Sequence, residues 1–305
     1  GLNPTAVAKI FAAKGRPNDN PLILHIARQE DILPLTTGLN ANARKLMEKF
    51  WPGPLTLIVE KSAVVPDAVS AGLPTVAVRF PANKLAQDFI KACGCPIAAP
   101  SANISGRPSP TNAQDVLEDM QGKVAAVLDG GSCGIGLEST VVDTTSPIPT
   151  ICRPGGVTYE MLTEALGAIE IDPALQGDKN FKPKAPGMKY RHYAPKADLT
   201  IIEGPLEKVV KEINKRAKEK SEAGYKVGVI GTEETVADYK SGDVKCIGTR
   251  ADESTIAANL FRILREFDDD QVDYIYSESF DTAGIGSAIM NRLLKAAGHH
   301  IEKLV

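Results

Sequence analysis

The sequence has few cysteines, little net charge and no long apolar run. Five of its 305 residues are cysteines. This number is odd and no C-x-x-C pair occurs, so neither a disulfide framework nor a cysteine metal site is predicted. Scattered thiols suit a reducing cytoplasm, where we expect the protein to act. No apolar run approaches the ~20 residues that span a bilayer, and no signal-peptide pattern appears, so no membrane partner is expected.

The charge balance and the glycine patterns argue against further classes of function, namely nucleic-acid binding and dinucleotide binding. The net charge is -3, so no overall basic field recommends a nucleic-acid partner. No Walker A motif occurs. The G-x-G of Gly284-Ile285-Gly286 lacks the third spaced glycine of a dinucleotide fingerprint and comes late in its domain, which disfavours that function. The chain is long enough for two domains.

The first half of the chain predicts a mixed α/β sheet, because many short strand patterns alternate with helices and loops. We expect strands at 22–26, 55–61, 75–81, 96–99, 125–128, 140–143 and 150–153. We expect helices at 5–13, 30–35, 40–50, 83–93, 113–120 and 157–166.

The second half predicts a separate, smaller domain. Strand patterns at 199–203, 226–231 and 272–277 alternate with helical patterns at 206–223, 254–267 and 286–292, which favours a parallel, Rossmann-like sheet. Regularity disappears between the two halves. We therefore assign 1–168 to the first domain, 169–197 to a linker and 198–305 to the second domain.

One stretch ends an expected strand with small and polar residues, Pro96-Ile97-Ala98-Ala99-Pro100-Ser101-Ala102-Asn103, and continues to Thr111. Ser101 and Asn103 offer two short hydrogen-bonding side chains where a strand runs out, a place at which α/β sheets bind ligands. The alternative is a loop that joins the strand to a helix capped by Thr111. This stretch alone does not decide between the two interpretations.

Cations and one histidine mark further candidate positions. Lys14 and Arg16 flank Gly15 at the end of the first helix, where they either complement the helix dipole or face a bound anion. Arg79 ends an expected strand, and a guanidinium there can grip a carboxylate with two hydrogen bonds. His25 lies on a short apolar strand, which by itself favours a histidine satisfied within the core.

Seven ordered motifs together resemble the YrdC-like threonylcarbamoyl-AMP synthases. They are K-G-R-P-x-x-N-P-L, W-P-G-P-L-T, T-V-A-V-R-x-P, A-P-S-A-N-x-S-G-x-P-S-P-T, E-S-T-V-V-D, R-P-G and P-G-M-K-Y-R-H-Y-A-P. The resemblance covers nearly the whole chain and is to the longer type. It implies an N-terminal YrdC-like domain with a twisted mixed sheet and flanking helices, followed by a smaller C-terminal Rossmann-like α/β domain.

The resemblance implies a nucleotidyltransferase that condenses L-threonine, bicarbonate or CO2, and ATP to threonylcarbamoyl-AMP and pyrophosphate, for modification of tRNA. The catalytic set that it implies is Lys14, Arg16, Ser101 and Asn103. The implied ATP contacts are Arg16, Asn20, Thr75, Ser101, Ser109, Arg153 and His192. The implied threonine contacts are His25, Arg79, Ala99 and Ser139.

The resemblance also implies partners and a lid. Mg2+ is expected with ATP, without a dedicated protein ligand. The product is expected to pass to a tRNA threonylcarbamoyl transferase, and contact with tRNA itself is possible but not required. The linker, which carries His192, is expected to cover the nucleotide and exclude water. Members of the family carry a strand and loop, roughly P-T-E-T-V-Y-G-L with a substrate-binding threonine, before the first helix, whereas this sequence starts at Gly1.

Three other functions compete with this interpretation. The first is an RNA-binding YrdC-like module, against which the acidic balance speaks. The second is a carbamoyl-transfer enzyme of the hydrogenase-maturation type, which would carry acylphosphatase and zinc-finger segments that the sequence lacks. The third is a nucleotide-binding regulator, which the sequence does not test.

Overall fold

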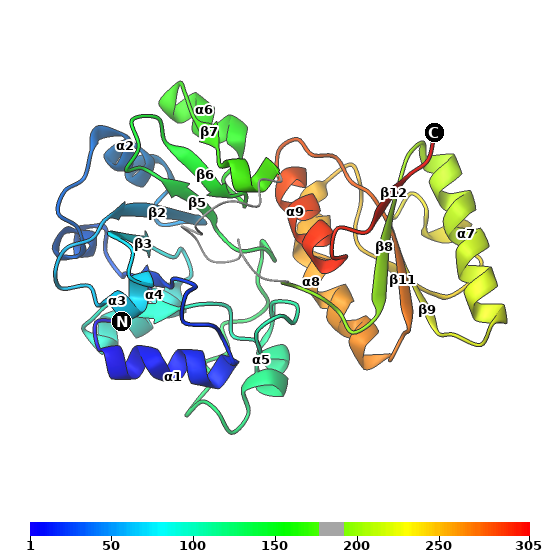
Figure 1. Cartoon of the computed structure of the whole chain (residues 1–305), viewed down its shortest axis with the longest axis horizontal. Helices are drawn as coiled ribbons and strands as arrows, with labels where there is room; N and C mark the ends of the chain where they lie inside the picture. Colours follow the sequence, from blue (N-terminus) through cyan, green and yellow to red (C-terminus); the bar gives the residue numbers. More distant parts are fainter. Residues whose placement is uncertain (177–191) are drawn as a thin grey trace. The chain divides into compact units, whose positions relative to one another are not determined.

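The computed structural model describes residues 1–176 and 192–305, and these form two compact units (Figure 1). The first unit consists of Gly1–Ser105, Asn112–Ser132 and the described part of Glu138–Tyr190. The second consists of Gly106–Thr111, Cys133–Leu137 and the described part of Arg191–Val305. Two short segments from the first half of the sequence therefore belong to the second unit.

A mixed sheet organises the first unit. Within the described residues it has seven strands in the order β4-β1-β3-β2-β5-β6-β7. β1 is parallel to β3, β2 to β5 and β6 to β7, and the other neighbours are antiparallel. The strands are β1 (Ile23–His25), β2 (Leu55–Glu60), β3 (Thr75–Arg79), β4 (Ile97–Ala99), β5 (Thr140–Asp143), β6 (Thr150–Arg153) and β7 (Glu170–Ile171).

Helices cover one face of this sheet and bury an apolar core against it. Val7 and Phe11 of α1 and Leu46 of α2 pack with Leu24 and Val78 of the strands. The helical segments are α1 (Pro4–Lys14), η1 (Gln29–Leu35), α2 (Ala41–Phe50), α3 (Asp67–Ser70), α4 (Lys84–Cys93), α5 (Ala113–Met120), α6 (Tyr159–Leu166) and η2 (Pro173–Gln176). A side-chain oxygen accepts from the backbone at the start of five of them, as expected of good N-caps; the capping residues are Asn3, Asn40, Asn83, Asn112 and Thr158.

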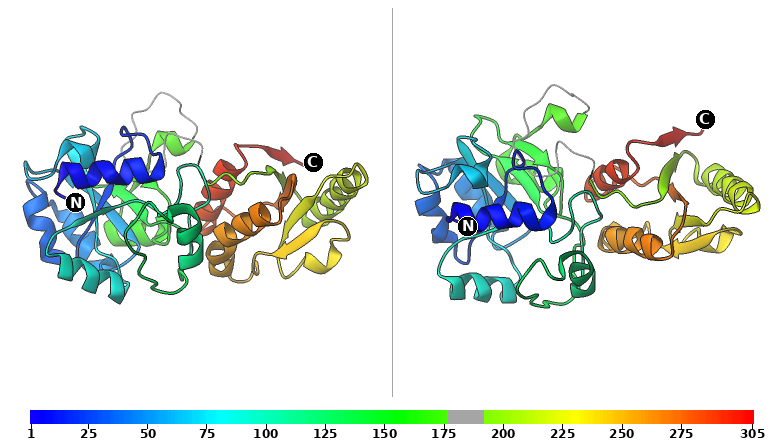
Figure 2. Two further views of the ribbon diagram at one scale, coloured as in Figure 1. Left: turned by 90° about the horizontal axis from the view of Figure 1, so that it is seen from below. Right: turned by 60° about the horizontal axis from the view of Figure 1, so that its bottom comes forward.

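The second unit is a parallel sheet between helices. Its described strands follow the order β10-β9-β11-β8-β12. Helix α7 covers one face, and α8 and α9 cover the other (Figures 1 and 2). The elements are β8 (Asp198–Glu203), α7 (Leu206–Glu222), β9 (Val227–Gly231), η3 (Val236–Asp238), β10 (Asp243–Cys246), α8 (Glu253–Asp269), β11 (Tyr274–Glu278), α9 (Gly286–Ala296) and β12 (Ile301–Lys303).

The predicted fold class is confirmed: a mixed sheet comes first and a parallel Rossmann-like sheet follows. Two local predictions are wrong. Residues 125–128 form no strand, and Leu128 is largely exposed because no neighbouring strand covers it. The cap of α5 is Asn112, whose Oδ1 accepts from Asp115 N, whereas the side chain of Thr111 is buried. The predicted helical segment at 30–35 is confirmed, and it is a 3-10 helix around Pro34, which lacks the N–H that an α-helix would use.

The predicted linker at 169–197 is partly regular. β7 pairs with β6, and η2 follows it, before the chain reaches 177–191, which lie outside the described residues. The structure also contains strands β10 and β12 and helix α3, which were not predicted from the sequence. Among the residues that the structure describes, no helix is long and apolar enough to cross a membrane.

The core of the second unit predicts a stability effect. The Phe267 side chain is fully buried, and a Cβ at Gly228 would lie 2.6 Å from its ring. Phe267→Ala removes this packing and should lower the free energy of unfolding by about 3–5 kcal/mol. Phe89→Ala is the control, because 46% of Phe89 is exposed. Thermal unfolding checks the pair; equal transition temperatures for the two variants would contradict this packing.

Candidate functional site

Strand register gathers the polar residues of the first unit on one face of its sheet. His25 lies opposite Arg79 between β1 and β3, and Arg79 lies opposite Thr56 between β3 and β2. Directly opposed residues point to the same side of a sheet, and so do alternate residues along one strand. The face that carries Arg79 therefore also carries Thr75, two residues along from Ala77.

This face has an apolar floor of its own. Ile23, Ile58, Ala77, Val141 and Cys152 form a small buried cluster apart from the core under the helices. Register adds Ala99, which lies opposite Ile23 across the β1–β4 pair. The result is a polar row beside an apolar floor, an arrangement typical of small-molecule sites.

Arg79 is held at its strand end by the preceding turn. Its Nε donates to Gly53 O at 3.1 Å, and Gly53 N donates to Phe80 O at 2.9 Å. A Cβ at Gly53 would lie 2.3 Å from Phe50 O, so only glycine fits there. The W-P-G-P turn thus fixes the direction of the guanidinium, which can receive a carboxylate.

Ser139 is the centre of a buried polar group. Its Oγ lies 2.7 Å from Thr56 Oγ1 and accepts from Arg153 Nη2 at 3.1 Å, while Arg153 Nε donates to Ser139 O at 3.0 Å. Arg153 was predicted to contact ATP; the structure places it with the predicted threonine contact Ser139. Thr56 was not singled out from the sequence, although it ends the W-P-G-P-L-T motif.

His25 is a neutral group in this cluster. Burial, followed by the charges of Arg79 and Arg153, lowers the pKa of His25 to about 4. Its Nδ1 is buried and makes no hydrogen bond within the described part of the chain. A neutral imidazole with so low a pKa is a hydrogen-bonding group for a ligand and a weak carrier of protons.

Lys14 holds the loop that follows β4. Its Nζ donates to Ser101 O and to Asn103 O, both at 2.5 Å, and its own carbonyl accepts from Ser105 N at 2.9 Å. The side chain is 5% exposed. Burial and the neighbouring Arg16 lower the pKa of Lys14 to about 7, although Asp119 opposes this shift. The predicted cation is therefore bound to the predicted loop.

Asp119 supports the same loop and was missed from the sequence. Its Oδ2 accepts from Ile104 N at 3.0 Å, and its side chain is 1% exposed at the end of α5. A buried carboxylate needs such partners. The only sequence signal would have been an aspartate on the buried side of that helix, which is weak by itself.

Arg16 and Asn20 close a second turn beside Lys14. Arg16 Nη2 donates to Pro21 O at 3.1 Å and to Asn20 O at 3.4 Å, and both side chains are buried. The chain then enters β1. Lys14, Arg16, Asn20, Ser101 and Asn103 thus form one group in the first unit.

Two predicted ATP contacts belong to the second unit. Ser109 lies in the segment Gly106–Thr111 and is buried, and His192 is the first described residue after the gap. The predicted lid at 169–197 falls largely on 177–191, outside the described residues.

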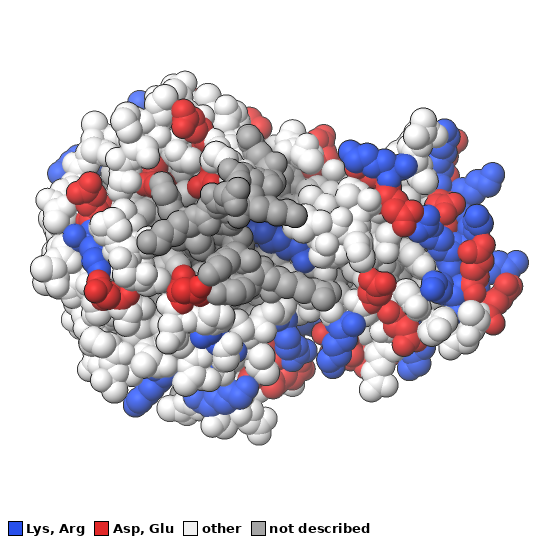
Figure 3. Space-filling view, viewed as in Figure 1, with Lys and Arg blue, Asp and Glu red and all other residues white. Residues whose placement is uncertain are grey.

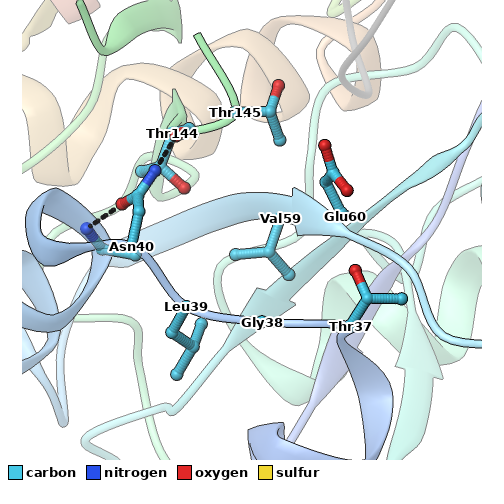
Figure 4. A pocket seen from close by; sticks show the side chains of 9 residues that line it. Thr37, Gly38, Leu39, Asn40, Val59, Glu60, Thr144 and Thr145 are labelled. Atoms are coloured by element: carbon cyan, nitrogen blue, oxygen red, sulfur yellow. Dashed lines mark hydrogen bonds between the residues drawn. The ribbon is translucent and has the colours of Figure 1, made fainter. Parts of the chain in front are cut away.

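A different hollow of about 360 Å³ lies at the C-terminal ends of the parallel strands β2 and β5 (Figure 4). Thr37, Glu60 and Thr145 point into it, and Asn40 donates to Thr144 O beside it. Its lining residues include a carboxylate and no cation, which does not suit a triphosphate. The described residues contain no cluster of histidine, cysteine or carboxylate side chains that could hold a metal ion.

Comparisons with known proteins give matches along nearly the whole chain. Residues 1–155 match the Sua5/YciO/YrdC family, described as telomere recombination, and residues 157–298 match the family described as threonylcarbamoyl-AMP synthase, C-terminal domain. Threonylcarbamoyl-AMP synthase of Pyrococcus abyssi is 48% identical over 99% of this chain and 87% of its own, and that of Bacillus subtilis is 49% identical over 98% and 85%.

A solved structure agrees with this result. Sua5 of P. abyssi, crystallised as a complex with L-threonine, has a TM-score of 0.94 and 46% identity over all of this chain and 88% of that chain. Both sheets therefore have counterparts in a solved relative.

The pKa of His25 predicts a pH effect on stability. An unfolded histidine binds a proton below about pH 6.5, whereas folded His25 stays neutral until about pH 4. Stability is therefore lost as the pH falls through this window. His25 accounts for a loss of roughly 3 kcal/mol between pH 7 and pH 4, and this part of the loss should be absent in His25→Gln.

Urea unfolding followed by the fluorescence of Trp51, the single tryptophan, reports on the first unit. His300→Gln is the control, because 69% of that side chain is exposed. An equal stability difference between wild type and His25→Gln at both pH values would contradict a neutral His25.

Proposed function

The chain belongs to the threonylcarbamoyl-AMP synthase family of the two-domain type, and from that premise we propose how its residues divide the reaction. The enzyme joins L-threonine, bicarbonate or CO2, and ATP into threonylcarbamoyl-AMP and pyrophosphate. The observation that carries the assignment is the shared face of β1 and β3, where register sets His25 beside Arg79.

L-Threonine binds on this face. Its carboxylate pairs with the guanidinium of Arg79, which the Gly53 carbonyl orients. Neutral His25 and the Ser139 hydroxyl provide the polar contacts, and Ala99 and the apolar floor receive the methyl group. A relative crystallised with L-threonine supports this choice of ligand.

In the first unit, the proposed ATP contacts centre on the group around Lys14. Arg16 supplies positive charge to the phosphates, and Ser101 and Asn103 donate to phosphate or acyl oxygens. Lys14 acts through the Ser101–Asn103 loop, whose carbonyls it binds. Asn20, Thr75, Ser109, Arg153 and His192 complete the proposed ATP contacts.

The chemistry then depends mainly on positioning. The neutral amine nitrogen of threonine forms a bond to the carbon of CO2 and releases one proton to solvent. An oxygen of the resulting carbamate then attacks the α-phosphorus of ATP. The bond between the α-phosphorus and pyrophosphate breaks. Fixed cations stabilise the charge that develops on the phosphates. Alignment of the two substrates supplies most of the remaining rate enhancement.

Mg2+ accompanies ATP in this proposal. Phosphate oxygens are the usual ligands of this hard cation. When bound it neutralises phosphate charge; no protein carboxylate is assigned to it.

The product passes to a tRNA threonylcarbamoyl transferase, and direct contact with tRNA is not required. The second unit gives no support to the RNA-binding alternative. Basic side chains on α7 are paired with acidic ones, so this helix presents no purely basic surface for RNA (Figure 3). We place the reaction in the cytoplasm, the compartment that scattered thiols suit.

Arg79→Ala tests the threonine contact. Loss of a bidentate charged contact should raise the KM for L-threonine by about 10- to 100-fold, with a smaller change in the KM for ATP. Initial rates of pyrophosphate release give both constants. Arg44→Ala, an exposed arginine of α2, is the control; an unchanged KM for threonine in Arg79→Ala would remove Arg79 from the site.

Arg16→Ala tests the phosphate contact. Removal of one electrostatic contact to the transition state should lower turnover by at least ~100-fold. Threonine- and bicarbonate-dependent pyrophosphate release is the measurement, with circular dichroism as a check of folding because Arg16 is buried. The exposed Lys9 of α1 gives the control Lys9→Ala. Turnover of Arg16→Ala at the wild-type rate would refute the contact.

A further inference from the structure

The segment Gly106–Thr111 is part of the first family domain in sequence and part of the second compact unit by its contacts. It continues directly from the loop that Lys14 holds, because Ser105 ends one unit and Gly106 begins the other. The second unit therefore fixes the downstream half of this loop, and α8 provides the anchoring side chains.

Arg265 is the first anchor. It lies on the buried side of α8 with 2% of its surface exposed, and its Nη2 donates to Pro108 O at 2.8 Å. Pro108 directly precedes Ser109, the proposed ATP contact. A charged donor on a buried carbonyl is a strong and directional interaction, so Arg265 sets the position of the Pro108–Ser109 backbone.

Asp268 is the second anchor, one turn further along α8. Its Oδ1 accepts from Lys196 N at 2.7 Å, and its Oδ2 lies 3.8 Å from Arg107 Nη2. The carboxylate thus binds the segment that carries Ser109 from one side and the segment that follows His192 from the other. Its side chain is 1% exposed, so the pairs are shielded from solvent.

The segment around His192 is fixed to the same helix. The ring of Tyr193 packs at 5.0 Å against Phe261 of α8, and Tyr193 is buried. Ala194 N donates to Gly106 O at 2.9 Å, which joins the two segments directly. Phe261, Arg265 and Asp268 lie at positions i, i+4 and i+7 and so share one face of α8.

A third segment, Cys133–Leu137, packs against α8. Cys133 N donates to Thr111 O at 2.8 Å, and a Cβ at Gly136 would lie 2.5 Å from Ala257 O. Gly136 also has φ +75°, so glycine is required there on two counts. The segments Gly106–Thr111, Cys133–Leu137 and His192–Lys196 are thus bound to one helix.

We propose that α8 is the platform that positions Ser109 and His192 for ATP, with Arg265 and Asp268 as positioning residues for the reaction. This gives the second domain a part in nucleotide binding, and it rests on the proposed ATP contacts of Ser109 and His192. Neither Arg265 nor Asp268 contacts substrate in this account; both act through the backbone that they hold.

The test uses the full chain and compares Arg265→Met and Arg265→Lys with Arg262→Ala. Arg262 is the matched control, because it lies on α8 one turn earlier, is 41% exposed and pairs along its own helix with Asn259 and Glu266. Initial rates of pyrophosphate release are measured against ATP at saturating threonine and against threonine at saturating ATP.

Arg265→Met should lower kcat/KM for ATP by about 10- to 100-fold, the scale of a misplaced binding group. The affinity for L-threonine, measured by calorimetry without ATP, should stay within about twofold of wild type, because the proposed threonine contacts lie in the first unit. Arg265→Lys retains one donor and should recover part of the loss. Hydrogen exchange should rise in 106–111 in Arg265→Met and stay unchanged in Arg262→Ala.

Arg107→Ala keeps the proposal testable if Arg265→Met fails to fold, because it breaks the Asp268 pair from the loop side at a side chain that is 26% exposed. It should weaken ATP use selectively in the same way. Wild-type kcat/KM for ATP and unchanged exchange in Arg107→Ala and in folded Arg265 variants would overturn the platform. Absence of threonine-dependent pyrophosphate release in the wild type would instead overturn the proposed function.

Discussion

The register between β1, β3 and β2 is the constraint on which the first unit depends. Because the side chains of a strand alternate between its two faces, a shift of one residue would turn Arg79 into the apolar core and expose Val78. The core under the helices prevents that shift, since Leu24, Leu57 and Val78 are fully buried in it. The apolar packing on one face thus determines which polar groups the other face offers to a ligand. The W-P-G-P turn adds the last element by orienting Arg79 through Gly53.

The loop that follows β4 passes from the first unit into the second between Ser105 and Gly106. Its first half is bound by Lys14 and Asp119 in the first unit, and its second half by Arg265 of α8 in the second. Each anchor is a buried charge with a backbone partner, which is costly to leave unpaired. The polypeptide between Ser101 and Ser109 therefore has little freedom at either end.

Much of this organisation could be predicted from local sequence. Asparagine caps with apolar periodicity define α1, α2 and α4, and apolar runs define β2 and β3, because these signals act within a few residues. The cations and hydroxyls of the site could be named from the family motifs. The strand expected at 125–128 fails because an apolar run without a partner strand stays exposed. Thr56, Asp119 and Arg265 could not be found, since their partners lie 83, 15 and 157 residues away in sequence.

The central claim is that threonine and ATP are bound by the charged and polar groups of the sheet face and its loop. A crystal structure of the full chain with L-threonine and a non-hydrolysable ATP analogue tests this most directly. The account predicts the threonine carboxylate on Arg79, next to His25 and Ser139, with the triphosphate at Arg16 and the loop that starts at Ser101. Threonine and nucleotide bound on the α7 side of the second sheet, or threonine in the hollow beside Glu60, would contradict it.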